Sequence, residues 1–564
     1  MRDAHAVADV RAAEAALMAR LPEGALMQRA ASGLAAACAG LLRRAGGTAG
    51  TYSTDGAVTP AGSIGAGGTA GTAAAGGTAG PVGAGRVYGS RVVVLAGSGD
   101  NGGDALHAGA RLAARGAVVT AIAAGSRVHE GGTAALRASG GRLIEAADDR
   151  ARQAIAAADL IIDGLLGIGG RGGLREPGAG LAAEAERARG LVVAADLPSG
   201  IDADTGEAAG AAVRADVTVT FGTWKPGLLI DPGASHAGVV ELVDIGLRGY
   251  LGPPAVAAAQ AADIAAWLPH PTAESDKYRR GVLGIVAGSD RFTGAAQLCV
   301  GAAVRGGAGM VRLVSAPAAA AVVRQHWPEA VITTTGDATT GETTTGETTT
   351  GDTTTGDART GAHVIEAAGR VQAWVGGPGM GTGDHAAGLL AAVLATSLPV
   401  LVDADGITLL AAHRELLSRS APTLITPHAG ELARLIGADR ADIEAHRLRF
   451  ATRAAAELGC TVLLKGSTTV IASPAADERV LVNPTGTSWL ATAGSGDVLS
   501  GLAGALLAQG LEPLRAAAAA AYLHGIAARL AAEGAPIGAS DVIRALPAAI
   551  RTVAGARILE LIKD

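Results

Sequence analysis

The residues with the clearest chemical potential lie in one stretch near the end of the chain, LATAGSGDVLSGLAGAL at 490–506. This stretch predicts a glycine-rich turn, Gly494 to Asp497, that opens into an apolar helix. The N–H groups of such a turn and of the helix N-terminus bind an anion such as a phosphate. Because a carboxylate would repel that anion, Asp497 is better interpreted as a base held beside a phosphate. The alternative is a plain turn in which Asp497 caps the helix.

A second polar turn, GSGDNGGD, follows a strand-like run in the first half of the chain. It matches the G-x-G-x-x-G pattern of dinucleotide-binding proteins, but Asp100 and Asp104 would repel a pyrophosphate, and the next strand lacks a terminal acidic residue. Asn and Asp oxygens suit a cation and sugar hydroxyls better. Asn101, Asp163 and Ser199 each follow a predicted strand, so we expect their oxygens to hold one monovalent cation. Asp163 and Ser199 have an alternative role as turn caps.

Five loops of the second half also follow predicted strands and carry polar or glycine residues. Parallel strands gather their carboxyl ends at one edge of a sheet, where ligands bind. Each loop alone has a structural explanation, such as a turn, a cap, a satisfied histidine or a surface lysine. Their succession in strand order favours a nucleotide site built from GGPGMGTGD (376–384), VDADG (402–406), TPHAGE (426–431), LLKGSTTVI (463–471) and the GSGD turn.

The elements that must position these loops alternate between strand and helix patterns. Apolar strand-like runs recur, with helical stretches between several of them, at 92–97, 117–125, 158–167, 190–200 and 215–222, and again from 281–289 onward. Such βαβ alternation predicts doubly wound α/β folds, and 564 residues are too many for one core. We therefore expect two α/β domains, at 1–250 and 272–564, joined by a linker without strands at 251–271.

Two low-complexity segments interrupt this pattern. Residues 45–86 repeat GGTAG, and residues 333–361 repeat TTTGD and TTTGE. Such segments bury too little apolar surface to offset the entropy of ordering them, so both are predicted to be disordered insertions.

The composition of the chain argues against several classes of partner. A formal net charge of −6 and an aromatic content of 2% leave neither a basic surface nor stacking platforms for nucleic acid. Three distant cysteines, Cys38, Cys299 and Cys460, fit neither a disulfide framework nor a zinc site. The sequence shows no signal peptide and no apolar run that would cross a bilayer. We expect a cytoplasmic homo-oligomer that binds neither nucleic acid nor membranes.

Three stretches of the first half, GDNGGDALHAGARL, IIDGLLGIGGRG and ADLPSGIDADTG, resemble the NAD(P)H-hydrate epimerase domain of the YjeF N-terminal family. The resemblance covers residues 8–248 outside the insertion and implies a Rossmann-like three-layer sandwich. The family motif is usually NNGGDG, whereas this chain has Asp100 at its first Asn and Ala105 at its last Gly. The resemblance implies that K⁺ is bound by Asn101, Asp163 and Ser199. It also implies that the hydrated nucleotide contacts Asp100, Asn101, Gly102, Gly103, Asp104, Gly167, Ile168, Gly169, Gly170, Arg171, Gly172, Gly173 and Asp196.

One lysine of the first half keeps two interpretations. Lys225 lies in FGTWKPG, at the carboxyl end of a predicted strand. It either faces the phosphates of the substrate or is a surface lysine whose stem covers apolar groups.

Longer stretches of the second half resemble the ribokinase-like superfamily and, within it, the ADP-dependent NAD(P)H-hydrate dehydratase of the YjeF C-terminal family. They include GGAGMVRLVSA, GGPGMGTG, TPHAGELARL and NPTGTSWLATAGSGDVLSG, within residues 265–550. The family commonly has His where this chain has Asp276. The resemblance implies a ribokinase-like three-layer sandwich, with Mg²⁺ bridging the phosphates and a hydrate pocket lined by Ala296, Gly379, His428 and the catalytic Asp497. It implies that ADP is held by Lys465, Gly466, Ser467, Thr468, Thr469, Gly494, Ser495 and Gly496.

Together the two resemblances imply an enzyme that repairs hydrated nicotinamide nucleotides. Its first half would interconvert the R and S hydrates of NADH and NADPH, and its second half would dehydrate the S hydrate at the expense of ADP. Asp497 would accept the proton of the hydroxyl that is phosphorylated. Two alternatives remain open. One is a ribokinase-like small-molecule kinase with a non-catalytic nucleotide-binding N-terminal domain, and the other is an N-terminal half that only binds a nucleotide or a partner.

Overall fold

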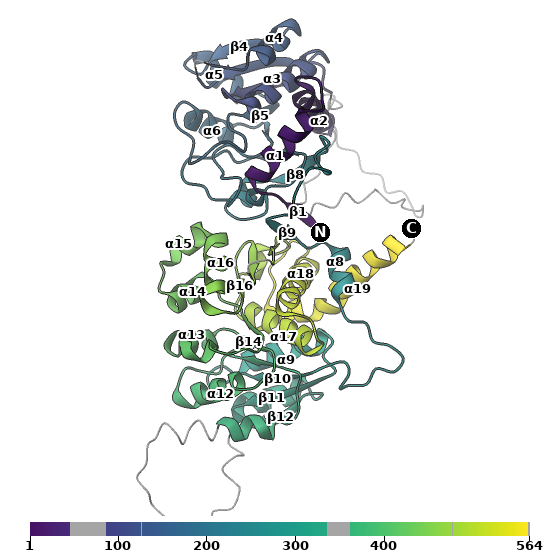
Figure 1. Ribbon diagram of the computed structural model, residues 1–564, viewed down its shortest axis with the longest axis vertical. Coiled ribbons are helices and arrows are strands. Elements are labelled where there is room, and N and C mark those ends of the chain that lie inside the picture. Colours follow the sequence, from purple (N-terminus) through teal and green to yellow (C-terminus); the bar gives the residue numbers. More distant parts are fainter. Residues whose placement is uncertain (45–85, 126, 336–360, 476–477, 562–564) are drawn as a thin grey trace, which may run out of the picture. The chain divides into compact units, whose positions relative to one another are not determined.

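The computed structural model describes residues 1–44, 86–125, 127–335, 361–475 and 478–561, with side chains to residue 555 (Figure 1). The chain forms two compact units. The N-terminal unit is Ala4–Pro253, and the C-terminal unit is Pro254–Asp564 together with Met1–Asp3. Most of the predicted insertion at 45–86 lies outside the described residues, as do residues 336–360 of the second insertion.

A seven-stranded parallel sheet forms the centre of the N-terminal unit, in the order β4-β3-β2-β5-β6-β7-β8. The strands are β2 (Arg91–Ala96), β3 (Val118–Ala123), β4 (Arg142–Glu145), β5 (Leu160–Gly164), β6 (Leu191–Ala195), β7 (Val217–Phe221) and β8 (Val239–Val243). The helices are α1 (Val7–Met18), α2 (Ala25–Arg44), α3 (Asp100–Ala113), α4 (Glu130–Ala138), α5 (Asp149–Ala156), α6 (Gly178–Arg187) and α7 (Gly233–Ala237). β5 and β7 are buried along their whole length, as expected for central strands with helices on both faces.

The strand order places a ligand crevice in this sheet. β2 lies between β3 and β5, so the chain leaves β2 toward one edge and later returns to its other side. The carboxyl ends of β2 and β5 therefore border the topological switch point, where doubly wound sheets bind ligands. The GSGDNGGD turn follows β2, and the loop at 165–173 follows β5, so both lie at this crevice.

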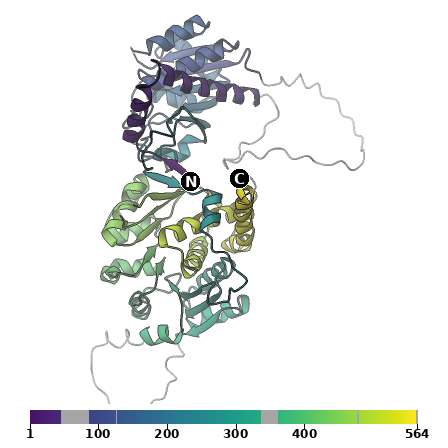
Figure 2. The same ribbon diagram turned by 45° about the vertical axis from the view of Figure 1, so that its right-hand side comes forward.

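One helix of the N-terminal unit is long and apolar enough to cross a membrane by length and composition alone. This helix, α2, is half buried and packs against α3 (dark purple in Figure 2). Its buried side chains, including Leu34, Cys38 and Leu41, belong to the apolar core beneath the sheet. Burial in the core therefore accounts for its apolar character.

The C-terminal unit contains an eleven-stranded sheet in the order β1-β9-β18-β17-β16-β15-β14-β13-β10-β11-β12. Its strands are β1 (Arg2–Ala4), β9 (Val256–Ala258), β10 (Val282–Val286), β11 (Met310–Ser315), β12 (Val331–Thr334), β13 (Ala373–Gly376), β14 (Val400–Val402), β15 (Thr423–Ile425), β16 (Thr461–Leu464), β17 (Thr469–Ala472) and β18 (Val480–Asn483). The pairs of β17 with β16 and β18 are antiparallel, and the strands from β12 to β16 are parallel. β10 lies between β11 and β13, which sets a second switch point.

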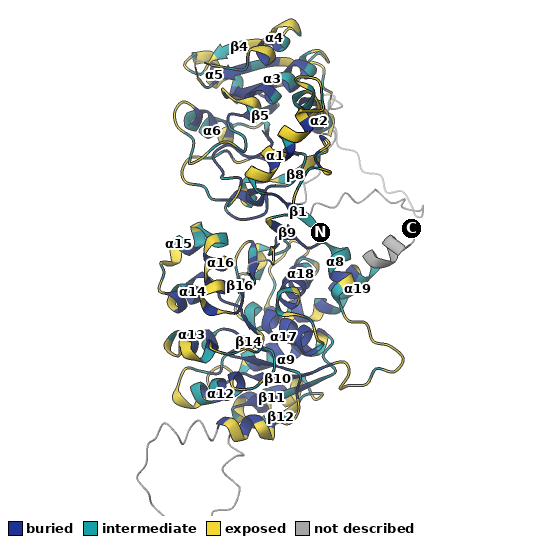
Figure 3. Ribbon diagram, viewed as in Figure 1, coloured by how far each residue is buried: buried dark blue, intermediate teal, exposed yellow. Residues whose placement is uncertain are grey.

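Helices cover both faces of this sheet and bring the GSGD turn to its carboxyl edge. They are α8 (Ala261–Trp267), α9 (Thr293–Arg305), α10 (Pro317–His326), α12 (Asp384–Leu394), α13 (Asp405–Ala412), α14 (Ala429–Ile436), α15 (Arg440–Ala445), α16 (Arg447–Leu458), α17 (Ser495–Ala508), α18 (Pro513–Ala532) and α19 (Ala539–Leu561). α17 is buried from residue 498 to its end (dark blue in Figure 3). Its small residues permit close packing, because a Cβ at Gly501 would lie 2.0 Å from the carbonyl oxygen of Cys299 on α9.

The structure corrects two sequence expectations. The stretch 251–271, expected to be a linker without strands, contains β9 and α8. Val256–Ala258 pair with β18 and are fully buried, and a capping box between Gln260 and Asp263 starts α8. The insertion expected from residue 333 begins later, because Thr333 and Thr334 still pair with β11. In both places, pairing with a neighbouring strand stabilises an element whose local sequence pattern is weak.

Candidate functional site

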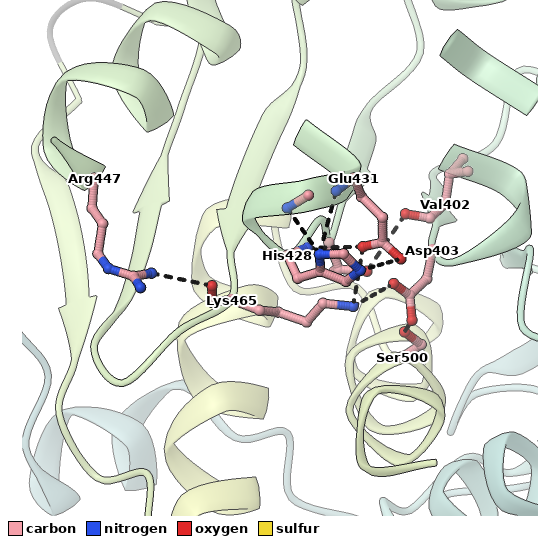
Figure 4. A network of polar contacts seen from close by, with 9 residues as sticks. Val402, Asp403, His428, Glu431, Arg447, Lys465 and Ser500 are labelled. Atoms are coloured by element: carbon pink, nitrogen blue, oxygen red, sulfur yellow. Dashed lines mark hydrogen bonds and ion pairs between the residues drawn. The ribbon is translucent and has the colours of Figure 1, made fainter. Parts of the chain in front are cut away.

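A lysine at the carboxyl edge of the C-terminal sheet links four elements (Figure 4). Lys465 follows β16, and its Nζ lies 2.8 Å from Oδ1 of Asp403 and 3.7 Å from Oε2 of Glu431. Asp403 follows β14 and is 1% exposed, and its other oxygen accepts a 2.7 Å hydrogen bond from Ser500 on α17. Burial alone would lower the pKa of Lys465, but the carboxylates of Asp403 and Glu431 raise it above its ordinary value. Lys465 is therefore a cation anchored at the predicted nucleotide site.

The predicted catalytic base, Asp497, lies next to this lysine. α17 starts at Ser495, after Gly494 at φ +86°, so Asp497 lies in its first turn and is not the N-cap. A Cβ at Gly496 would lie 3.4 Å from Nζ of Lys465, which places the start of α17 against the lysine. Burial, and then the charge of Asp403, raise the pKa of Asp497 to about 7. A carboxyl group with this pKa is suited to accept a proton near neutral pH.

His428 joins the same group of loops as the N-cap of α14. Its Nδ1 accepts hydrogen bonds from the N–H groups of Gly430 and Glu431 at 3.0 and 3.3 Å. Glu431 in return accepts from the N–H of His428 at 2.8 Å, so the two residues form a capping box. Burial lowers the pKa of His428, which is about half exposed, and a bridge joins its backbone to Lys465.

The other predicted hydrate-pocket residues differ in accessibility. Gly379, at φ +59°, lies against α9, because a Cβ there would be 2.7 Å from Cβ of Ala295. Its loop is tied to α13 by a 2.9 Å hydrogen bond from the N–H of Gly381 to Asp405. Ala296 is 0% exposed and lies beneath Gly288, so its side chain does not reach the surface of the site.

The predicted nucleotide-binding loop connects β16 to β17. A guanidinium N–H of Arg447 points to the carbonyl oxygen of Lys465 at 3.4 Å, and a Cβ at Gly466 would collide with this guanidinium. Gly466 and Ser467 are exposed, Thr468 is buried and Thr469 opens β17. Ser495 closes its own turn by donating to the carbonyl oxygen of Leu490 at 2.8 Å.

Several residues of this site were not in the predicted set. VDADG and TPHAGE were recognised as site loops, but neither Asp403 nor Glu431 was given a role in the predicted set. Ser500 follows Asp497 by three residues, which places both on one face of α17. His524 on α18 lies against the backbone of Ser495, and burial lowers its pKa to about 4, so the imidazole beneath the turn is neutral.

The three oxygen donors predicted for a cation do meet in the N-terminal unit. The amide of Asn101 donates to the carbonyl oxygen of Leu166 at 2.9 Å, and Ser199 Oγ donates to Oδ1 of Asp163 at 2.6 Å. The N–H of Leu166 donates to Ser199 Oγ at 2.8 Å, which joins the two pairs. Asp163 is 0% exposed, and burial raises its pKa to about 6. Among the described residues no donor is hydrogen-bonded to the side-chain carbonyl oxygen of Asn101, so the cluster is rich in oxygen acceptors.

Lys225 fits neither of its two predicted roles. It is 1% exposed, and its Nζ pairs with Asp196 and donates to Thr220 Oγ1 and the carbonyl oxygen of Phe221, both at 3.0 Å. These partners use all three ammonium donors. Asp196 itself has φ +65°, which is strained for a residue with a side chain, and such strain is concentrated at functional sites.

Carboxyl groups surround this ion pair. Asp100 and Asp104 lie in the first turns of α3, and Oδ1 of Asp104 is buried without a hydrogen-bond partner among the described residues. Burial first, and then the charges of Asp196, Asp100 and Glu14, raise the pKa of Asp104 well above its usual range. Glu14 on α1, which was not predicted, responds in the same way: burial and then Asp196 raise its pKa.

The glycine-rich loop after β5 packs tightly onto its surroundings. A Cβ at Gly167 would lie 3.0 Å from Cβ of Asn101, and one at Gly173 would lie 2.5 Å from Cα of Gly210. A Cβ at Gly102 would lie 2.3 Å from the carbonyl oxygen of Gly97, and one at Gly103 would lie 2.9 Å from the ring of His129. The remaining predicted members of this loop are Ile168, Gly169 and Gly170, together with the exposed Arg171 and Gly172.

Neither site is a preformed cage for a transition metal. Within the described ranges, no three His, Cys, Asp or Glu side chains are arranged to hold a metal ion.

Each half of the chain matches a known protein family. Residues 283–547 match the family model described as NAD(P)H-hydrate dehydratase, and residues 23–227 match that of the YjeF-related protein N-terminus. An ADP/ATP-dependent NAD(P)H-hydrate dehydratase from Bacillus subtilis, crystallised with ATP/Mg²⁺, is 27% identical, with a TM-score of 0.43, covering 52% of this chain and 97% of that one.

Two curated relatives extend over nearly the whole chain. The bifunctional NAD(P)H-hydrate repair enzyme Nnr of Mycobacterium leprae is 43% identical over 534 residues, which is 94% of each protein. The enzyme of the same name from Mycobacterium tuberculosis is 44% identical over 521 residues, 92% of each. The chain therefore belongs to the family of bifunctional NAD(P)H-hydrate repair enzymes.

Proposed function

We propose that this protein repairs hydrated nicotinamide nucleotides with two active sites. The N-terminal site interconverts the R and S hydrates of NADH and NADPH, and the C-terminal site dehydrates the S hydrate at the expense of ADP. The observation that carries the proposal is Asp497, a carboxyl with a pKa of about 7 that lies beside Lys465 at the N-terminus of α17. A base next to a phosphate-binding helix end is what activation of a hydroxyl for phosphorylation requires.

The chemistry of dehydration follows from the poor leaving ability of hydroxide. Asp497 accepts the proton of the hydroxyl on C6 of the hydrated ring, and that oxygen attacks the terminal phosphorus of ADP. The new O–P bond replaces the bond to AMP, which leaves. The phosphorylated oxygen then departs from C6 as phosphate, and loss of a ring proton restores the double bond of NADH or NADPH.

The residues around Asp497 hold the charges of this reaction. The backbone of the turn from Gly494 to Gly496, at the start of α17, faces the charge that develops on the transferred phosphoryl group. Lys465 and the following loop, Gly466 to Thr469, hold the nucleotide. His428 and Gly379 line the hydrate pocket, and Ala296 supports it from below.

Mg²⁺ fits the C-terminal site as a partner of the nucleotide. Glu431 and Asp403 offer carboxylates beside Lys465, and a site with few protein ligands is typical of Mg²⁺ bound through substrate phosphates. When bound, Mg²⁺ would neutralise the phosphate oxygens. Asp403 and Glu431 are the residues that would hold it, and both lie within 4 Å of Lys465.

K⁺ fits the oxygen cluster of the N-terminal site. Asn101, Asp163 and Ser199 would hold it, and the buried carboxyl of Asp163 supplies one negative charge among neutral oxygens. The hydroxyl groups of the hydrated nucleotide would contact Asp100, Asp104 and Asp196, with the loop from Gly167 to Gly173 along its length. We also expect the protein to act in the cytoplasm as a homo-oligomer, without nucleic-acid or membrane partners.

The experiment that tests the proposal supplies the purified chain with the isolated R hydrate and ADP, and follows the absorbance band of NADH. We expect the R hydrate to be consumed and NADH to form. If the R hydrate persists while S hydrate supplied in a parallel reaction is converted to NADH, epimerisation is contradicted. Accumulation of a phosphorylated substrate without NADH would instead support the small-molecule kinase, which the names of the relatives do not favour. Replacing ADP with ATP in parallel defines the phosphoryl donor.

A further inference from the structure

Helix α1 borders the N-terminal site, although the predicted set of site residues contains none from it. Arg11 and Glu14 are three residues apart, so they lie on one face of α1. The guanidinium of Arg11 lies against the glycine-rich loop, because a Cβ at Gly169 would be 2.8 Å from its Nη2. Glu14 is close enough to Asp196, Lys225 and Asp100 to interact with their charges. One turn of α1 therefore reaches from the glycine-rich loop to the buried ion pair.

Carboxyl groups outnumber cations around this site. Four carboxyl groups lie at the end where β2 and β6 stop, those of Glu14, Asp100, Asp104 and Asp196. The lysine at this end, Lys225, has all of its donors satisfied by protein groups and is 1% exposed. A pyrophosphate carries two negative charges, so it is repelled from this end of the site.

Arg11 is the cation beside the glycine-rich loop, one turn of α1 from Glu14, with whose charge it interacts. It is exposed, and within the described part of the chain it has no ion pair shorter than 4.0 Å. A guanidinium presents its N–H donors in a planar fork that matches two oxygens of one phosphate. Gly169 and Gly170 carry no side chains of their own, so a phosphate can approach their backbone next to this fork.

We propose that Arg11 binds the pyrophosphate of the hydrated nucleotide and thereby directs its hydrated ring toward Asp196 and Lys225. This assignment rests on the proposed function of the N-terminal site and adds a residue from α1 to it. The shared chemistry is recognition of a phosphate by a guanidinium. NADPH hydrate carries a second phosphate group that a guanidinium could bind, its 2′-phosphate, which NADH hydrate lacks.

The test uses the full chain with the variant Arg11→Gln. Interconversion of the R and S hydrates is measured by chromatography without added nucleotide, so that dehydration does not intervene. A charge-assisted hydrogen bond is worth about 1.5–3 kcal/mol, so we expect KM to rise about 10- to 100-fold. The kcat should change little, because Arg11 touches the phosphate and not the reacting ring. Arg11→Lys, which keeps the charge but not the fork, should show an intermediate KM.

A matched control is available just beyond the end of the same helix. Arg20 lies over the ring of Tyr250, 5.6 Å from its centroid, and has no part in the proposed site. Arg20→Gln should leave KM unchanged. Dehydration of the S hydrate with ADP, measured for each variant, shows that the C-terminal site remains intact. Circular dichroism of the Arg11 variants shows that α1 is retained.

The outcomes separate the inference from the function on which it rests. An equal rise in KM for NADH hydrate and NADPH hydrate supports the pyrophosphate assignment. A rise for NADPH hydrate alone overturns it in favour of the 2′-phosphate, and an unchanged KM for both overturns Arg11 as a phosphate ligand. Absence of interconversion by the unmodified chain would instead contradict the epimerase function.

Discussion

Each unit of this protein has a lysine at the carboxyl edge of its sheet, paired with a buried or largely buried aspartate, but the two pairs differ in exposure. Lys225 is 1% exposed and gives all three donors to Asp196, Thr220 and Phe221. Lys465 has a side chain that is 21% exposed, and among the described residues it has one close partner, Asp403, with Glu431 at 3.7 Å. Lys225 therefore stabilises the fold of its unit, whereas Lys465 retains donors for a ligand. Position at a strand end is therefore insufficient to assign a role to a lysine.

Both pairs also stand next to a strained backbone position. Asp196 after β6 has φ +65°, and Ala404, which follows Asp403 after β14, has φ +51°. Each such residue costs on the order of 1–3 kcal/mol, which the surrounding fold must offset. In the N-terminal unit the strain falls on the paired aspartate itself, and in the C-terminal unit it falls on the following residue. The two sites thus reach similar pairs through different local backbones.

The largest expected effect separates the chemistry of the two sites. Asp497→Asn removes the base from the C-terminal site and should lower the rate of dehydration about 10²- to 10⁴-fold. Interconversion of the R and S hydrates should be unaffected, because Asn101 and Asp196 belong to the other unit. Separate assays of dehydration and interconversion check this result.

The reciprocal variant is Asn101→Ala, which should abolish interconversion and retain dehydration of the S hydrate. For the Asp497→Asn variant, loss of both activities in a folded protein would contradict the prediction that the two sites act independently.

The next effect tests the two lysine pairs directly. Lys225→Met leaves Asp196 largely buried without its partner and should destabilise the N-terminal unit by about 3–5 kcal/mol. Lys465→Met should cost less stability, because water reaches that pair and Asp403 keeps Ser500, but it should weaken ADP binding. Hydrogen exchange of the amides in β7 and β16 measures the local stability of each unit. Equal destabilisation by the two substitutions would show that exposure does not distinguish the pairs.

The smallest effect concerns the pH dependence of dehydration. Asp497 acts as a base only when ionised, so kcat/KM should fall as the pH drops below its pKa of about 7. The charge of Asp403 contributes to raising this pKa, so Asp403→Asn should move the acidic limb to lower pH. The readout is the midpoint of the acidic limb of the pH profile, measured from pH 5 to 9. The maximal rate is not used, because it also changes when Lys465 loses its partner Asp403. A limb that stays in place would mean that another group limits the rate.

Much of the candidate site was predictable because the motifs lie at strand ends. Asn101 and Ser199 follow β2 and β6, Asp163 lies near the end of β5, and the structure brings the three together around Leu166. His428, Lys465 and Asp497 likewise meet at one edge of the second sheet. Two doubly wound folds were predicted correctly for the same reason: buried parallel strands form continuous apolar runs that are easily recognised.

Other residues escaped prediction because their role depends on distant contacts. Glu14 and Arg11 lie in an ordinary helical sequence, and only packing of α1 brings them near Asp196 and Gly169. β9 and α8 were missed because three apolar residues, Val256–Ala258, are too short a run to indicate a strand without the partner β18. Their residue types are compatible with several structures, and contacts far along the chain select one.

The sequence by itself determined the two α/β folds, the strand-end loops that form the two candidate sites, and the carboxylate that we propose as the base. Those features follow from the local order of apolar runs, glycines and acids, which is independent of distant contacts. The tertiary structure decided which lysine is a structural ion pair and which can bind a ligand, and it gave Asp497 a pKa of about 7. Burial and the arrangement of neighbouring charges set those properties, and both exist only once the chain is folded.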